Sequence, residues 1–296
     1  MTLDERIKKD LAERLKGNPI TAAQKLAPLA KADKKFQFST KGLPTYFTGD
    51  TDAKTVFVQL NPGMDADLAD ERWDFDTQYF SEEDFIEDYK ENRRNYGKND
   101  RLRYDSFDVK QAAFLYGWED SGINFSEIEW SILDKEQRKR AKETTWLSAK
   151  EHVLMDKLQL ELIPYASRKF DINPDNIYLL DEYVEILLDE IFKTKRTYVI
   201  FGGTVFDDLF QRFPDAFKDL TEKKSIDLNG LQKADGTPWT SPLYYKIIEM
   251  YYNGHTQKAL IAYTFPHQGL SNAFGIMEKY GRQCYEELKP YLEKRK

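Results

Sequence analysis

The sequence predicts an α/β protein with a central, mostly parallel, four-stranded sheet in a three-layer α/β/α arrangement. Short apolar runs alternate with helical patterns along the second half of the chain. This order is typical of parallel strands that are joined by crossover helices. Several of the runs end abruptly at glycine, proline or asparagine, and 41% of the residues are hydrophobic, enough for a sizeable core.

The expected elements follow from these patterns. The strands are short apolar runs, and they cover residues 56–60, 158–164, 198–203 and 259–263. The expected helices cover residues 2–16, 21–31, 108–117, 126–150, 176–193, 205–213 and 272–293. In the first helix, Leu3, Ile7 and Leu11 recur four residues apart, which places them on one face. Residues 219–256 are expected to be irregular, with a helix at 242–252.

The chain is expected to form a single domain over residues 1–296. Its segment 66–150 is rich in aromatic and charged residues and has no strand pattern. A structureless stretch of this length is uncommon inside a compact domain. We therefore expect residues 66–150 to form a helical insertion or cap.

Composition narrows the class of protein. The sequence contains no apolar run near the roughly 18 residues that a membrane span needs, and its start lacks the pattern of a signal peptide. The single cysteine, Cys284, excludes an internal disulfide and a cysteine-based zinc cluster, and the 3 histidines are not spaced as metal ligands. We expect a cytoplasmic monomer without a metal or organic cofactor. The net charge of −7 counts against broad, non-specific DNA binding.

Two predicted strands run into loops with unusual polar content. The first strand is followed by Asn61-Pro62-Gly63, and the last by a loop that contains His267 and Ser271. In open α/β sheets, ligands bind just beyond the carboxyl ends of the strands. The two loops are therefore expected to form one composite site.

In order and chemistry, these loops resemble motifs of the uracil-DNA glycosylase superfamily, in its mismatch-specific and single-strand-selective branches. The first family motif ends a strand with Asn-Pro-Gly, as at Asn61. The second is a loop that enters the duplex, and Gly269-Leu270-Ser271 matches its end. The strand that ends at Tyr165 looks like the family's base-recognition strand. The resemblance covers roughly residues 55–65 and 155–290, and 66–150 lie outside it.

The resemblance implies an enzyme that flips a base out of single- or double-stranded DNA and hydrolyses its N-glycosidic bond. By this resemblance Asn61 positions the attacking water, Pro62 fixes the backbone, and Gly63 lets the base approach closely. Leu270 would fill the vacated place in the base stack. The residues expected to contact DNA are Arg168, Gln268, Gly269, Leu270 and Ser271.

Three positions depart from the family pattern. His267 lies one residue later than the catalytic histidine of relatives, where it either reaches the departing base or caps loop backbone. Gln59 replaces a common glycine, either as a packing change or by narrowing the pocket floor. Glu161 replaces the asparagine that reads the base. An ionised glutamate only accepts hydrogen bonds, which favours a base with an amino group unless burial protonates the carboxyl. Alternatively, Glu161 faces away or pairs with a nearby Lys or Arg.

Other readings of the chain stay open. Trp73 and Phe75 follow the first motif, where relatives stack a ring on the base, but they are equally consistent with buried core residues. The acidic charge, the displaced His267 and the exchange at Glu161 favour a second function, in which the fold only binds nucleic acid or a nucleobase or nucleotide. A third alternative is an unrelated α/β protein whose loops match by chance.

Overall fold

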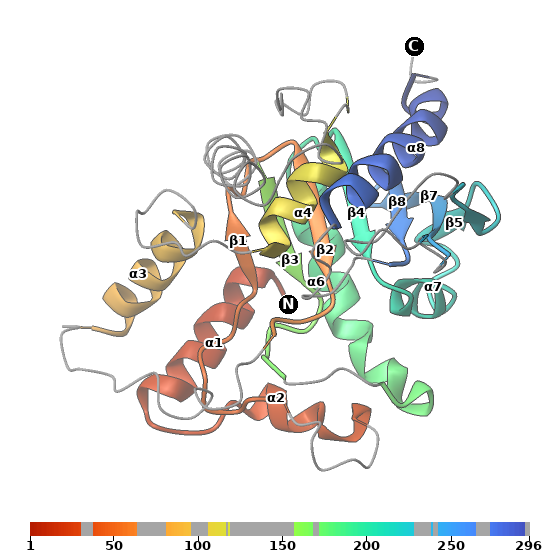
Figure 1. The fold of residues 1–296 in the computed structure, drawn as a ribbon. Coiled ribbons are helices and arrows are strands. Elements are labelled where there is room, and N and C mark those ends of the chain that lie inside the picture. The colour runs from red at the N-terminus through yellow and green to blue at the C-terminus, as the bar shows by residue number, and fades with distance from the viewer. Residues whose placement is uncertain are drawn as a thin grey trace.

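The structure is a computed structural model whose chain folds around one mixed sheet (Figure 1). It describes residues 1–30, 38–63, 81–95, 106–116, 118, 157–167, 172–227, 238, 242–264 and 273–293. The strands are β1 (Phe47–Gly49), β2 (Thr55–Gln59), β3 (Lys157–Glu161), β4 (Tyr198–Gly202), β5 (Phe217–Asp219), β6 (Lys224–Ser225), β7 (Tyr244–Tyr252) and β8 (His255–Ala262).

The central strands of the sheet are parallel, which confirms the predicted α/β class. The order across the sheet is β1-β3-β2-β4-β8-β7-β5, with β6 paired to β7. Strands β3, β2, β4 and β8 are parallel to their neighbours within this group, whereas β1 and β7 add to it in the antiparallel direction. The parallel strands are the four that the sequence predicts, but the predicted total is wrong because the sheet has eight strands.

The largest correction concerns residues 242–252, where the sequence pattern predicts a helix. They form β7, a long strand that pairs with β8 in the antiparallel direction, with Tyr245 opposite Ala262. A two-residue turn joins the strands, and both of its residues, Asn253 and Gly254, have positive φ angles, 48° and 80°. This is the turn geometry that two-residue hairpins prefer. Because both faces of β7 carry apolar side chains, its sequence has no strict alternation that would distinguish a strand from a helix.

Most of the helices lie near predicted positions, but α3 (Glu82–Arg94) has no individually predicted counterpart. The helices are α1 (Leu3–Leu15), α2 (Thr21–Lys25), η1 (Ala27–Leu29), α3 (Glu82–Arg94), α4 (Ser106–Leu115), η3 (Pro174–Leu180), α6 (Asp181–Phe192), α7 (Val205–Phe210) and α8 (Ala273–Glu293). Helix α1 begins at a capping box, in which Thr2 and Glu5 each accept a hydrogen bond from the other's backbone amide. All of the predicted helix 126–150 and most of the expected insertion 66–150 lie outside the described residues.

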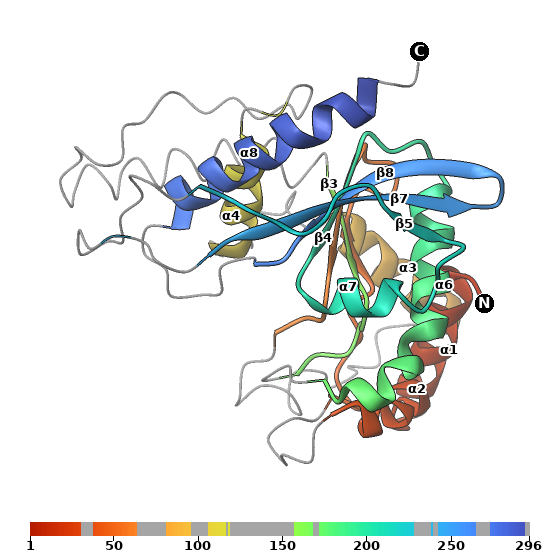
Figure 2. The same ribbon diagram turned by 90° about the vertical axis from the view of Figure 1, so that its right-hand side faces the viewer.

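The core lies on both faces of the sheet. Val56 and Val58 of β2 pack into one apolar cluster with residues of α1, α6 and α7, whereas Phe57 points to the opposite face and joins residues of α4 and α8. Figure 2 shows α4 and α8 on one side of the strands and α1, α2 and α6 on the other. Strand alternation therefore decides which side chains face which group of helices. Among the described residues, no helix is long and apolar enough to cross a membrane.

Arg196 joins the end of α6 to the turn before β2, and it gives a first stability prediction. Its guanidinium donates to the carbonyl oxygens of Ala53 (2.6 Å), Glu190 (3.1 Å) and Ile191 (3.2 Å), and only 2% of the residue is exposed. Two of these acceptors are carbonyls of the last turn of α6, which lack helical partners.

We expect Arg196→Met to lower the free energy of unfolding by about 3 kcal/mol, because three buried carbonyls lose a charged donor. Urea denaturation followed by circular dichroism measures the change. Arg212→Met is the matched control, because Arg212 pairs with Asp181 at an exposed position and exposed pairs contribute little. Equal losses in the two variants would contradict the structural role of Arg196.

Candidate functional site

The order of the parallel strands places a candidate site between β2 and β4. Along the chain β2 is followed by β3, which pairs on one side of β2, and the next parallel strand, β4, pairs on the other side. Ligands in open α/β sheets bind outside the carboxyl ends of the strands, at the point where the strand order reverses in this way. Asn61 lies just beyond the carboxyl end of β2, at this edge of the sheet.

The side-chain amide of Asn61 is held in one orientation by its surroundings. Its Nδ2 atom lies 2.7 Å from Ser167 Oγ, 3.1 Å from the Pro62 carbonyl oxygen and 3.5 Å from the Tyr165 carbonyl oxygen. Carbonyl oxygens only accept hydrogen bonds, so the nitrogen end of the amide must face them. Among the described residues, no hydrogen bond to Asn61 Oδ1 is present, so within this part of the chain the oxygen is available as an acceptor.

The loops that follow β2 and β3 run alongside each other beyond the sheet. The Ser167 amide donates to the Pro62 carbonyl oxygen at 3.2 Å, and Gly63 forms a parallel bridge with Ser167. Ser167 is buried, whereas Gly63 is exposed. The backbone on both sides of Asn61 is therefore tied to the neighbouring loop, which fixes the position of its side chain.

Gln59 and Glu161 form a polar pair at the carboxyl ends of β2 and β3. They are register partners in the parallel ladder, and they are only 7% and 6% exposed. The side chain of Gln59 reaches over β4, where a Cβ atom on Gly202 would lie 2.5 Å from Gln59 Oε1. Glycine at position 202 thus provides the space that Gln59 occupies. Within the described part of the chain, Gln59 Nε2 and Glu161 Oε2 have no hydrogen-bond partner.

A chain of side-chain amides connects Glu161 to a buried lysine at the other end of β3. Gln159 Nε2 donates to Glu161 Oε1 at 2.6 Å, and Gln111 Nε2 of α4 donates to Gln159 Oε1 at 3.0 Å. The Lys157 ammonium group donates to Gln111 Oε1. Burial raises the pKa of Glu161 to about 8, against the opposing effects of Gln159, Lys157 and Arg93. Glu161 is therefore mostly a neutral acid at pH 7, and its direct partner is an amide rather than a Lys or Arg.

A second buried cluster holds the loop behind Asn61, and the sequence patterns did not reveal it. The Asp10 carboxylate accepts hydrogen bonds from the hydroxyls of Tyr46 (2.5 Å) and Tyr165 (2.6 Å), and Tyr183 donates to Tyr165 at 3.4 Å. Burial is the main cause that raises the pKa of Asp10. The carbonyl oxygen of Tyr165 also accepts a hydrogen bond from Asn61. Asp10 of α1 therefore helps to hold the residue that positions the Asn61 amide. The one feature of the sequence that could have indicated this cluster is Asp10, a carboxylate next to the apolar face of the first helix.

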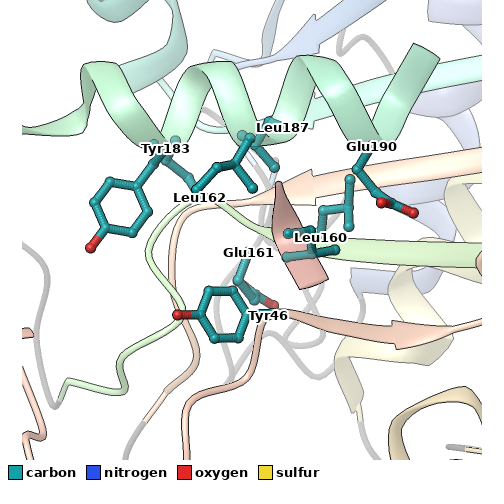
Figure 3. Close-up of a pocket in the computed structure, with 9 residues that line it drawn as sticks. Tyr46, Leu160, Glu161, Leu162, Tyr183, Leu187 and Glu190 are labelled. Carbon is teal, nitrogen blue, oxygen red and sulfur yellow. The ribbon is translucent and has the colours of Figure 1, made fainter. Parts of the chain in front are cut away.

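A small cavity lies between β3 and α6 (Figure 3). Leu162 of the β3 exit and Leu187 and Glu190 of α6 help to line it, and its volume is about 10 Å³. A space of this size holds at most one water molecule. Glu161 borders the cavity, but Figure 3 shows its carboxyl group turned away from α6. The cavity is therefore too small to be the ligand site.

The structure brings together part of the predicted site. Gln59 and Glu161 are register partners at the carboxyl ends of β2 and β3, and Asn61, Pro62 and Gly63 follow in the loop after β2. The remaining predicted residues lie outside the described part of the chain: Trp73, Phe75, Arg168, His267, Gln268, Gly269, Leu270 and Ser271. In the described ranges, no group of three or more His, Cys, Asp or Glu side chains is placed to hold a metal ion.

Comparisons with protein-family models, with curated proteins and with solved structures give no match for this chain. The family suggested by Asn61-Pro62-Gly63 and by the later loop thus stays a prediction.

Proposed function

We propose that this protein is a DNA glycosylase-like hydrolase, with the three-layer α/β/α fold of the uracil-DNA glycosylase superfamily. In this proposal it acts as a cytoplasmic monomer on single- or double-stranded DNA. It flips out a damaged, mismatched or modified base and hydrolyses the N-glycosidic bond. The observation that carries the proposal is the fixed amide of Asn61, which turns Oδ1 away from its anchors.

The geometry of Asn61 suits the positioning of a water molecule. A water that donates one hydrogen to Asn61 Oδ1 is oriented with a lone pair free for attack on the sugar carbon. An uncharged amide does not remove the water proton strongly, so we expect slow turnover. The bond that breaks joins the sugar to the base, which leaves with negative charge while the sugar becomes oxocarbenium-like. The water oxygen then bonds to the sugar carbon, and the proton that the water loses goes to the departing base. Neutral donors near the base stabilise that charge, and protonated Glu161 is such a donor.

The test is a strand-nicking assay on labelled oligonucleotides that carry uracil, mismatched thymine, hypoxanthine, xanthine or modified cytosines, followed by alkali. We expect Asn61→Ala to lower the cleavage rate by about 100-fold or more, the lower end of what a positioned catalytic group contributes. Ser167→Ala removes one anchor of the amide and should lower the rate by only about 5-fold, close to the value of one hydrogen bond.

The controls separate loss of chemistry from loss of folding. Both variants should keep the circular dichroism spectrum and the melting temperature of the wild type to within a few degrees. Absence of cleavage by folded, concentrated wild-type protein on every base in the panel would overturn the proposal, as would full activity in Asn61→Ala.

A second function, binding without cleavage, is favoured by one observation. Within the described part of the chain, the groups in contact with the Asn61 amide are the Ser167 hydroxyl and the carbonyls of Pro62 and Tyr165, and none of these three takes up a proton near pH 7. Anisotropy measurements on the same oligonucleotides distinguish the two functions. Base-dependent binding without any cleavage supports the binding function.

A further inference from the structure

Lys157, at the start of β3, is a buried lysine on the same face of the strand as Gln159 and Glu161. Alternate residues of a strand share a face, and Lys157 and Glu161 are only 1% and 6% exposed. The Lys157 ammonium group donates to Gln111 Oε1, and it lies 3.5 Å from Gln159 Oε1. A charge is buried at high cost unless it is hydrogen-bonded, and a satisfied buried network specifies one arrangement of its members.

The ammonium group of Lys157 fixes the direction of the hydrogen bonds along this chain. An ammonium group only donates, so Gln111 turns its oxygen toward Lys157 and its nitrogen toward Gln159, at 3.0 Å. Gln159 then accepts with Oε1 and donates with Nε2 to Glu161 Oε1, at 2.6 Å. Either end of an amide side chain fits the same space, and only its partners decide between them. The direction of the bond at Glu161 therefore follows from a charge at the opposite end of β3.

We infer that Lys157 is a positioning residue for the candidate site, because the chain that it directs decides which oxygen of Glu161 is able to donate. Oε1 is occupied by the donor from Gln159, so the proton of the neutral acid is carried by Oε2. This oxygen has no hydrogen-bond partner among the described residues. The use of this donor by a departing base rests on the proposed function, whereas the direction of the chain rests on the contacts themselves.

Loss of the ammonium group would leave the chain free to reverse. In the reversed chain Glu161 donates from Oε1 to Gln159, and Oε2 becomes an acceptor. A hydrogen bond donated by the neutral acid favours the protonated state. The charged groups that lower the pKa of Glu161 are Lys157 on β3 and Arg93 on α3, whereas α4 contributes the neutral Gln111. Removal of Lys157 should therefore raise the pKa of Glu161 above its value of about 8.

The first experiment measures the pKa of Glu161 in the whole protein, without DNA. Protein labelled with ¹³C at the glutamate carboxyls is titrated by NMR, and the signal of Glu161 is the one that Glu161→Gln removes. We expect Lys157→Met to raise this pKa by about one unit, which is about a tenfold change in proton affinity. Gln111→Met breaks the next link and should raise the pKa by less, because Lys157 still lies 3.5 Å from Gln159 Oε1.

Lys246→Met is the matched control for the loss of a buried lysine. Lys246 is only 8% exposed, but it pairs with Asp207 at 2.6 Å and with Asp219 at 2.7 Å, outside the chain of amides. This variant should leave the pKa of Glu161 unchanged. Circular dichroism checks the fold of each variant, and if Lys157→Met does not fold, the result for Gln111→Met decides.

The second experiment repeats the strand-nicking assay over a range of pH. In the proposed function, cleavage by the wild type falls above the pKa of Glu161, because ionisation removes the donor. Lys157→Met should move this fall to higher pH by the shift that NMR measures. It should also lower the rate below the fall by about 5-fold, close to the value of one hydrogen bond. A lysine that only stabilised the fold would not move the position of the fall.

The outcomes separate this inference from the proposed function. An unchanged or lowered pKa of Glu161 in the folded Lys157→Met and Gln111→Met variants would overturn the role of Lys157, as would an equal rise in Lys246→Met. Cleavage with the same pH profile in the wild type and in Lys157→Met would also overturn it and would leave the glycosylase proposal standing. The expected rise in pKa without any cleavage by the wild type would overturn the proposed function alone, and Lys157 would still direct the chain.

Discussion

Glu161→Gln is expected to make the protein more stable than the wild type at pH 8, by up to about 5 kcal/mol. The wild-type carboxyl holds its proton up to a pKa of about 8 in the folded state, against an ordinary value of 4.5. Between these values the folded protein binds more protons than the unfolded chain, so the free energy of unfolding falls as pH rises. Glutamine resembles the protonated acid in shape and keeps an oxygen for Gln159.

Urea denaturation at a series of pH values from about 4 to about 9 measures this effect, because the series spans both pKa values. The two proteins should be similar in stability at the acid end and diverge as pH rises, with the wild type the less stable. A shallower fall should remain in the variant, because burial also raises the pKa of Asp10 and Glu190. Parallel curves for the wild type and Glu161→Gln would show that the carboxyl is ionised at neutral pH, which would contradict the effect of burial on its pKa.

Gly281→Ala is expected to lower the free energy of unfolding by about 3 kcal/mol or more, as overpacking of a rigid contact does. Gly281 lies on α8 where this helix crosses α4, and an added Cβ would overlap the carbonyl oxygen of Phe114. The clash is with backbone, so no side-chain rotation relieves it. The carbonyl oxygen of Gly281 also accepts from Trp118 Nε1 at 2.8 Å, and separation of the helices would break this bond.

The expected loss of stability at Gly281 is opposite in sign to the usual effect of replacing glycine by alanine in a helix. At an open helical position, replacing glycine by alanine usually stabilises a protein by about 0.5–1 kcal/mol. Thermal and urea unfolding of the variant therefore decide whether α4 is packed directly on α8. Gly63→Ala is the control, because a Cβ added there would meet no heavy atom within 4 Å, and its stability should change little. A neutral or stabilising effect at Gly281 would contradict the close helix contact.

The sequence by itself determined the α/β class and the four parallel strands, because these follow from local properties. The run from Val56 to Val58 is apolar at every position, as a strand buried on both faces must be. Asn61-Pro62-Gly63 marks where that strand stops. The spacing of Leu3, Ile7 and Leu11 defines α1. Each of these signals lies within one short segment and needs no knowledge of its neighbours.

The tertiary structure alone decided the features that depend on partners far apart in the chain. Residues 244–252 form a strand because their backbone pairs with β8. Their own side-chain pattern does not distinguish a strand from a helix. The neutral state of Glu161 comes from its burial, and the space for Gln59 comes from Gly202 on another strand. Pairing, burial and protonation depend on the surroundings of a residue, and folding brings those surroundings together.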